Sequence, residues 1–229
     1  MDFSLFIPHM AEIWSEYWQV FLFQGLKNTL LLTCISVALG TVLGTIVAMG
    51  KMSKFAPLRW LVSVYIEVLR GTPILLQLYL FYFVLPQVLP FLKLSQFVWV
   101  SIALCVNSSA YVSEVIRSGI QAVDKGQTEA ARSLGLSQGQ TMMKVILPQA
   151  VKNILPTLGN EFIALIKETS VVSFVGAADL YVAFNFIGSN SYEFMVPYLT
   201  MAIIYIALVM LITLLIKLME RSLRKSDRN

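Results

Sequence analysis

The sequence predicts an all-α, polytopic membrane protein with five transmembrane helices, an interfacial N-terminal helix and one polar cytoplasmic loop. Of its 229 residues, 57% are hydrophobic and 13% are charged, and the mean hydropathy is +0.74. A single soluble core could not bury that much apolar surface. Apolar runs of about 20 residues, enough to cross about 30 Å of hydrocarbon, recur along the chain. The lysine and arginine residues between these runs gather mainly on alternate loops, as in proteins that cross a bilayer several times.

Residues 1–25 predict a helix that lies at the membrane surface and leads into the first span. They combine the carboxylates of Asp2, Glu12 and Glu16 with many aromatic side chains, which favour the headgroup level. These aromatic residues are Phe3, Phe6, Trp14, Tyr17, Trp18, Phe21 and Phe23. The segment shows neither the basic start nor the small-residue cleavage site of a signal peptide, so we do not expect it to be cleaved as one.

The predicted spans are residues 28–50, about 58–86, 94–113, about 153–178 and 194–216. The second span contains Glu67 and Arg70, and Pro73 predicts a kink in it. The fourth span is the least apolar, because three charged residues interrupt it. The small residues Gly40, Gly44 and Gly50 of the first span leave two hypotheses open, close contact with another helix or ordinary exposure to lipid.

The basic residues between the spans predict the orientation. One side of the membrane receives Lys51, Lys54, Arg59, Arg117, Lys125, Arg132, Lys144, Lys152, Lys217, Arg221, Arg224, Lys225 and Arg228. The other side receives Lys27 and Lys93. Because lysine and arginine accumulate on cytoplasmic loops, we expect the N-terminus outside and the C-terminus in the cytoplasm. The domain organisation predicted is an N-terminal segment at 1–25, one transmembrane domain at 26–220 and a basic cytoplasmic tail at 221–229.

The loop of about residues 121–150 predicts two short helices on the cytoplasmic surface. Asp124 is placed to cap the first helix, and Gly135 is placed to end it in the left-handed conformation. Ser137 followed by Gln140 predicts a capping box at the start of the second helix, which Pro148 is expected to close or kink. A well-formed polar helix pair between two apolar spans predicts a docking platform for a cytoplasmic partner.

The same loop resembles the EAA loop in the membrane subunits of ATP-binding-cassette importers. Its matching residues are Glu129, Ala130 and Ala131, then Gly135 after three residues, and Val145, Leu147 and Pro148 after nine more. Isoleucine is usual in the family where Val145 stands. Three further stretches resemble the polar amino acid permeases of the histidine/glutamine type: IEVLRGTP at 66–73, NSSAYVSEVIRSGIQAV at 107–123 and LGNEFIALIKETSVVSFVGAADL at 158–180. The resemblance covers residues 22–225.

This resemblance implies a type I importer permease in the bacterial plasma membrane. It implies a dimer with a second, identical or homologous permease, two cytoplasmic ATPase subunits that bind the ATP, and an extracellular binding protein that delivers the amino acid. The residues that would couple the permease to the ATPase are Glu129, Ala130, Ala131, Arg132, Gly135, Leu147 and Pro148.

Polar side chains within the spans mark a candidate substrate pathway, because burying them in the membrane is costly. Asn107, Tyr111 and Glu114 recur at intervals of four and three residues, which places them on one helical face. The other candidates are Glu67, Arg70, Gln77, Lys167, Glu168, Thr169 and Ser170. Their charges leave two hypotheses open: contacts to the ammonium and carboxylate of an amino acid, or structural ion pairs, such as Arg70 with Glu67 or Glu114.

Acidic groups outnumber basic ones in these spans, which favours a cationic or polar amino acid. Glutamine and cystine remain alternatives.

Other function classes fit the sequence less well. The stretch LSQGQ at 136–140 is close to an ATPase signature, but the chain has no phosphate-binding G-x-x-x-x-G-K-[ST] loop, so no bound cofactor is expected. His9 is the only histidine, and Cys34 and Cys105 lie in apolar runs, which argues against a catalytic or metal centre. A secondary transporter would usually show two related halves, and this sequence has no obvious internal repeat. A channel subunit would need a filter-like segment, and none is apparent. No nucleic-acid partner is expected.

Overall fold

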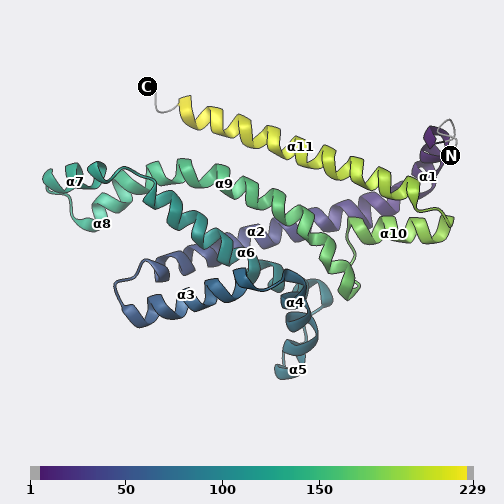
Figure 1. The fold of residues 1–229 in the computed structure, drawn as a ribbon, viewed down its shortest axis with the longest axis horizontal. Helices are drawn as coiled ribbons and strands as arrows, with labels where there is room; N and C mark the ends of the chain where they lie inside the picture. Colours follow the sequence, from purple (N-terminus) through teal and green to yellow (C-terminus); the bar gives the residue numbers. More distant parts are fainter. Residues whose placement is uncertain (1–5, 226–229) are drawn as a thin grey trace.

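The computed structural model describes residues 6–225, in which every regular element is a helix. The long helices form an elongated bundle that runs between two ends (Figure 1). Among the residues discussed above, Asp2, Phe3 and Arg228 lie outside the described part of the chain.

The N-terminal segment is a helical extension of the first span. Helix α1 (Phe6–Gln19) passes through a π-helical turn, η2 (Val20–Leu26), into α2 (Lys27–Lys51). Together they form one apolar helix of 45 residues, Ile7–Lys51, about 68 Å long and so longer than a membrane is thick. Ile13 and Phe21 pack against Leu180 and Phe184, so one face of the predicted N-terminal helix is held by protein.

The second predicted span is broken rather than kinked. Helices α3 (Ala56–Gly71) and α4 (Ile74–Tyr79) meet at a bend of 107°, and η3 (Leu80–Val84) and α5 (Leu85–Val88) continue from α4. Pro73 causes the break, because its ring forces Thr72 into an extended conformation, and it has no N–H to bond the Leu69 carbonyl.

Helix α6 (Gln96–Gln121) lies at the centre of the bundle and crosses α2 at close range. A Cβ atom on Gly40 would lie 2.8 Å from the Ser108 hydroxyl, and one on Gly44 would lie 2.9 Å from the Ser109 carbonyl. Of the two hypotheses for these glycines, helix contact is therefore confirmed. Both cysteines lie in apolar runs, which predicts packed thiols, and Cys105 is indeed buried. Cys34 of α2 is exposed, so this prediction is wrong for Cys34.

The helix pair predicted for residues 121–150 exists, but its second helix is not closed by Pro148. Helix α7 (Lys125–Ser133) is separate, whereas α8 (Gln138–Thr141) runs through the π-helical turn η4 (Met142–Ile146) into α9 (Leu147–Glu168). Pro148 directly follows η4, so its missing N–H falls where the helix changes from π-helical to α-helical bonding. The π turn also absorbs the irregularity, so the platform joins the fourth span as a continuous helix.

The chain then turns back through a buried polar corner. The 3-10 helix η5 (Thr169–Val175) ends at Gly176, whose φ of 73° suits glycine. Asp179 is fully buried and caps α10 (Leu180–Ser191), while the Leu180 N–H donates to the Thr29 hydroxyl of α2 at 2.9 Å. Helix α11 (Met195–Lys225) then runs back along the bundle.

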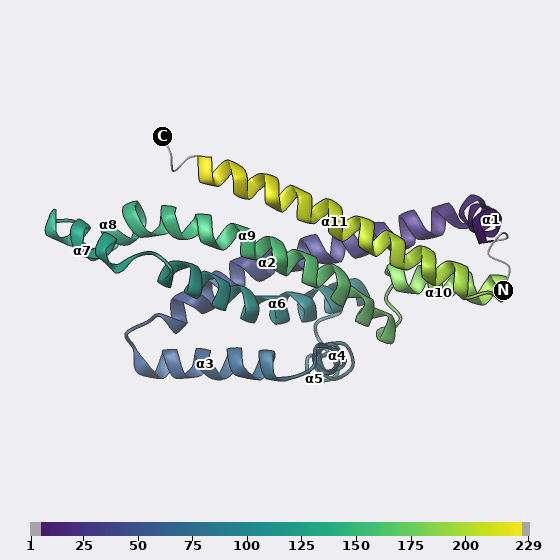
Figure 2. The ribbon, with the colours of Figure 1, turned by 45° about the horizontal axis from the view of Figure 1, so that its top comes forward.

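Within the described residues, three helices are long and apolar enough to cross a membrane, and there are five spans if each bent pair counts as one. The bent pairs are Ala56–Gly71 with Ile74–Val88 and Gln138–Val175 with Leu180–Ser191. In Figures 1 and 2, the α2–α3 loop, α7 and α8 gather at one end of the bundle, and α1 and α10 lie at the opposite end. The end that holds residues 52–55, α7 and α8 is called the basic end below.

Candidate functional site

A cluster of charged side chains lies between α3 and α6. The guanidinium of Arg117 clasps the Glu114 carboxylate, with distances of 3.1 Å from Nε to Oε1 and 2.6 Å from Nη2 to Oε2. Arg70 of α3 approaches the same carboxylate at 4.0 Å and lies over the Tyr111 ring, 5.5 Å from its centroid. All four side chains remain partly exposed, so the cluster is open to a ligand.

The helical spacing on α6 explains this geometry. Tyr111, Glu114 and Arg117 follow one another at intervals of three residues and so share one face. The bend after Gly71 ends α3 one residue beyond Arg70, which therefore projects from a helix terminus toward that face. Of the two partners the sequence left open for Arg70, the structure places Glu114 beside it.

Gln77 and Asn107 lie elsewhere, in a buried network that holds the α3–α4 bend. The Gln77 amide donates to the Leu69 carbonyl at 2.7 Å and to the Thr72 hydroxyl at 2.9 Å. It thereby replaces the bond that Pro73 cannot make. Asn107 donates to the Gln77 side-chain oxygen at 2.9 Å, and both residues are at least 96% buried. Their described contacts are to the protein itself, which suits a role in fixing the bend.

The candidates on α9 and η5 divide into exposed, partly exposed and buried groups. Lys167 is exposed, Glu168 is partly exposed, and neither has an ion-pair partner among the described residues. The Thr169 hydroxyl is buried and donates to the Ile166 carbonyl at 2.7 Å, while Ser170 donates to the Lys167 carbonyl at 2.8 Å. Glu67 is exposed on α3 and likewise has no ion-pair partner in the described part of the chain.

The second candidate region is the helical platform at the basic end, formed by α7 and α8. The Asp124 carboxylate accepts from the Gly126 N–H at 2.7 Å, and Ser137 and Gln140 form the predicted capping box. Gly135 has a φ of 86°, the left-handed value that the sequence predicted. The Leu136 N–H bonds the Ala131 carbonyl at 3.2 Å, which completes a Schellman-type helix end.

The two alanines of the EAA motif have different environments. Glu129 and Ala130 are exposed, whereas Ala131 is only 5% exposed and faces the rest of the chain. Arg132 donates to the Leu136 carbonyl at 2.7 Å and so braces the turn. Of the two closing residues, Leu147 is partly buried and Pro148 is exposed. The resemblance to the EAA loop implied that both alanines contact the ATPase, but only the side chain of Ala130 is exposed to a partner.

The platform also carries apolar surface that the motif did not include. Leu134 is 81% exposed and Met143 is 66% exposed. Leu134 directly follows α7 and Met143 lies in η4, and α7 and α8 project beyond the long helices at the basic end (Figure 1). Such a capped, rigid and partly apolar tip has the character of a protein-docking surface.

Arg117 is the site residue that the sequence analysis missed, because it was counted only as a loop charge that reports orientation. The usable signal was its spacing from Glu114, since oppositely charged residues three positions apart on a helix are neighbours.

The broken helices, the charged cluster within the spans and the projecting platform define the transmembrane subunit of an ATP-binding-cassette transporter. A family model described as "Binding-protein-dependent transport system inner membrane component" matches residues 40–225. The chain belongs to this family and is a polar amino acid permease within it. It is therefore a multi-pass protein of the bacterial inner membrane and a transport subunit rather than a catalytic enzyme.

Curated relatives cover most of the chain. It is 40% identical over 227 residues to the arginine transport system permease protein ArtQ of Bacillus subtilis (strain 168), with 99% of each chain covered. It is 42% identical over 203 residues to the putative glutamine transport system permease protein GlnP of Rickettsia conorii, covering 89% of this chain and 93% of the relative. The L-cystine transport system permease protein TcyB of Bacillus subtilis is 39% identical over 210 residues, with 91% and 88% covered.

Solved structures share the fold. The structure described as "Crystal structure of an amino acid ABC transporter with histidines" matches with a TM-score of 0.85 and 46% identity, covering 91% of this chain and 96% of the other. The inward-facing MetNI methionine ABC transporter matches with a TM-score of 0.75 at 22% identity, covering 89% and 96%, which is a likeness of fold alone.

Proposed function

We propose that this chain carries a polar L-amino acid, with a cationic one as the first candidate, inward across the membrane as part of an ATP-driven importer. A cytoplasmic ATPase, two copies in each complex, binds and hydrolyses the ATP. A second permease, identical or homologous, completes the membrane part, and an extracellular binding protein delivers the amino acid. The observation that carries the proposal is the rigid platform at the end of a helix that continues into the spans.

The continuous helix from α8 to α9 supports a mechanism for coupling. A force applied to the platform by a closing ATPase pair is passed on through α9, because the π turn η4 keeps α8 and α9 in one helical body. Movement of α9 relative to α6 then changes the packing around the charged cluster. ATP binding drives this change only insofar as it favours one packing over the other in free energy.

The charges on the polar faces of α6 and α9 support the choice of substrate class. Glu161 and Glu168 are partly exposed on α9 and have no ion-pair partner within the described residues. Glu114 adds a third carboxylate, which Arg117 and Arg70 partly neutralise. Carboxylates without partners in a span favour a positively charged ligand, and Arg70 is available for the carboxylate of an amino acid. The relatives named for glutamine and cystine make these neutral amino acids the second candidates.

Glu114→Gln is expected to lower the transport of lysine-, arginine- or histidine-like substrates by at least about tenfold and to lower that of neutral polar substrates less. The change keeps the shape but removes a charge that attracts a cation by about 4 kcal/mol, before desolvation, at roughly 4 Å and an effective dielectric of about 20. A tenfold change needs about 1.4 kcal/mol of this. Uptake of both substrate kinds, normalised to the amount of permease in the membrane, measures the difference.

Arg117→Gln is the matched control for this experiment, because it breaks the same ion pair and leaves the Glu114 carboxylate in place. Cationic uptake is expected to persist in this variant. If both variants instead lose protein and all transport together, the pair is structural and Glu114 has no part in choosing the substrate.

The proposed orientation places the basic end in the cytoplasm. Single cysteines at Ser137 in the capping box and at Ser189 of α10, in a background without Cys34 and Cys105, are expected to react from opposite sides of the membrane. An impermeant maleimide applied to intact cells should label only the cysteine at Ser189, and opening the cells should add the other. Labelling of both in intact cells would contradict the orientation.

The function itself is tested by reconstitution. The permease is expected to co-purify with an ATPase subunit, and ATP hydrolysis in proteoliposomes that contain the binding protein is expected to rise with the transported amino acid. Comparing lysine, arginine, histidine, glutamine and cystine at equal concentrations identifies the substrate. Amino acid transport that is driven by an ion gradient and needs no ATP would exclude the proposal.

A further inference from the structure

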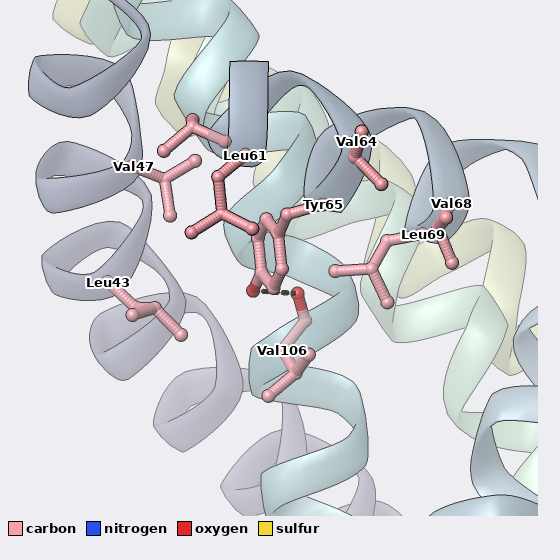
Figure 3. Close-up of a pocket in the computed structure, with 9 residues that line it drawn as sticks. Leu43, Val47, Leu61, Val64, Tyr65, Val68, Leu69 and Val106 are labelled. Carbon is pink, nitrogen blue, oxygen red and sulfur yellow. Dashed lines mark hydrogen bonds between the residues drawn. The ribbon is translucent and has the colours of Figure 1, made fainter. Parts of the chain in front are cut away.

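A groove with a volume of about 670 Å³ lies between α2 and α3, with α6 as its floor. Figure 3 shows Val47 of α2 facing Leu61 of α3 across it, with Val106 of α6 at its base. Val68 lines the groove farther along α3. This groove is separate from the charged cluster, because none of its lining residues belongs to that cluster.

The groove offers almost no polar group to a ligand. Tyr65 is the one lining residue with a polar side-chain atom, and its hydroxyl lies 2.6 Å from the Ser109 hydroxyl. The same hydroxyl lies 3.4 Å from the Val106 carbonyl, the bond drawn in Figure 3. Since this hydroxyl is already engaged, the surface is suited to a purely apolar ligand.

The groove extends over most of the depth of one leaflet. Helices α2 and α3 touch beside their loop, where a Cβ atom on Gly50 would lie 2.9 Å from Val62, and they diverge from there (Figure 2). Leu61 and Val68 are two helical turns apart, about 10 Å along α3. One leaflet has about 15 Å of hydrocarbon, half of the bilayer core. The groove is therefore long enough for most of one acyl chain and too short for a helix that crosses the whole membrane.

Two cations stand at the loop end of the groove. Lys54 and Arg59 are exposed, and neither side chain has a hydrogen-bond or ion-pair partner in residues 6–225. By contrast, Lys51 donates to the Ser63 hydroxyl at 2.6 Å. Phe55 and Trp60 beside them are 65% and 69% exposed, and exposed aromatic residues of this kind lie at the headgroup level of a membrane.

We propose that this groove binds one acyl chain of an anionic phospholipid, whose phosphate is held by Lys54 and Arg59. The apolar lining takes the chain, the depth fits one leaflet, and the two cations without partners give the site its preference for a negative headgroup. The lipid fills the space that opens where α2 and α3 diverge. The proposal concerns a face of the molecule outside the transport site and does not depend on which amino acid is carried.

The test uses the full chain in vesicles that contain phosphatidylglycerol or phosphatidylcholine with a photoreactive diazirine on the acyl chain. Mass spectrometry of the cross-linked peptides is expected to show labelling at residues 61–69 with a preference for phosphatidylglycerol. The double variant, Lys54→Gln with Arg59→Gln, is expected to reduce this preference by about fivefold for each charge removed. This fold-change corresponds to about 1 kcal/mol for each basic residue near a membrane. Lys93→Gln, in the loop between α5 and α6 and outside the groove lining, is the matched charge control and should leave the preference unchanged.

A second variant tests the groove itself. Val64→Trp places an indole in the groove and is expected to remove most of the labelling at residues 61–69, whereas Ile206→Trp on the exposed face of α11 should not. Unchanged labelling in Val64→Trp would overturn the proposal, as would equal labelling by the two lipids in the unmodified protein. A disulfide between two permease chains through Val64→Cys, in a background without Cys34 and Cys105, would also overturn it by showing that a second copy covers the groove.

Discussion

Gly135→Val is expected to abolish transport while the protein still inserts into the membrane at its normal level. The φ of 86° at Gly135 lies in the left-handed region, which costs a residue with a side chain about 1–2 kcal/mol and a β-branched residue more. The valine therefore reorganises the helix end that separates α7 from α8, and the docking surface loses its shape. Co-purification of the ATPase subunit and amino acid uptake are the two measurements.

Gly139→Val is the matched control, because Gly139 lies in α8 with a right-handed backbone. A Cβ atom at either glycine would have no neighbour within 4 Å, so the two variants differ in backbone conformation and not in steric crowding. The control is expected to keep most of the ATPase association. Normal association in Gly135→Val would show that the left-handed turn is not needed for docking.

Glu129→Lys tests the same platform through charge. The Glu129 side chain is exposed on α7, so reversing its charge is expected to leave the fold intact and to disrupt contact with the partner. Glu220→Lys on α11 makes the same change in charge away from the platform. Equal ATPase association in the two variants would remove Glu129 from the docking surface.

Gly44→Val is expected to lower the stability of the whole bundle by about 1–3 kcal/mol, the usual cost of forcing extra carbon atoms into a packed interface. A Cβ atom there would lie 2.9 Å from the Ser109 carbonyl and 2.9 Å from Val112, and a backbone carbonyl cannot swing aside. Helices α2 and α6 must therefore separate. A lower melting temperature in detergent and a reduced amount of folded permease in the membrane are the expected results.

Gly71→Val makes the same substitution where a Cβ atom would meet nothing within 4 Å. We expect its melting temperature to stay close to that of the unmodified protein. If the two variants melt alike, the α2–α6 crossing tolerates separation and the close contact contributes little to stability.

Local signals in the sequence were enough to predict the helical class, the apolar segments and the capped ends of the platform. The caps at Asp124 and Ser137 and the left-handed Gly135 each depend on a few neighbouring residues, so the residue types alone specified them. Pro73 was visible as the site of a kink, although the structure has a break there. The size of the bend was not, because 107° depends on the buried amide of Gln77 and on Asn107 from another helix.

The sequence by itself determined that this chain crosses a membrane and presents a rigid polar platform between two spans, because periodicity, capping and the missing N–H of proline act over a few residues. Only the tertiary structure decided which polar groups meet. It buried Gln77 and Asn107 in the α3–α4 bend, paired Glu114 with Arg117 and brought Arg70 beside them. It also carried α8 through Pro148 into α9. The physical reason is that these outcomes depend on the distances between helices, which residues far apart in the sequence set together when they pack.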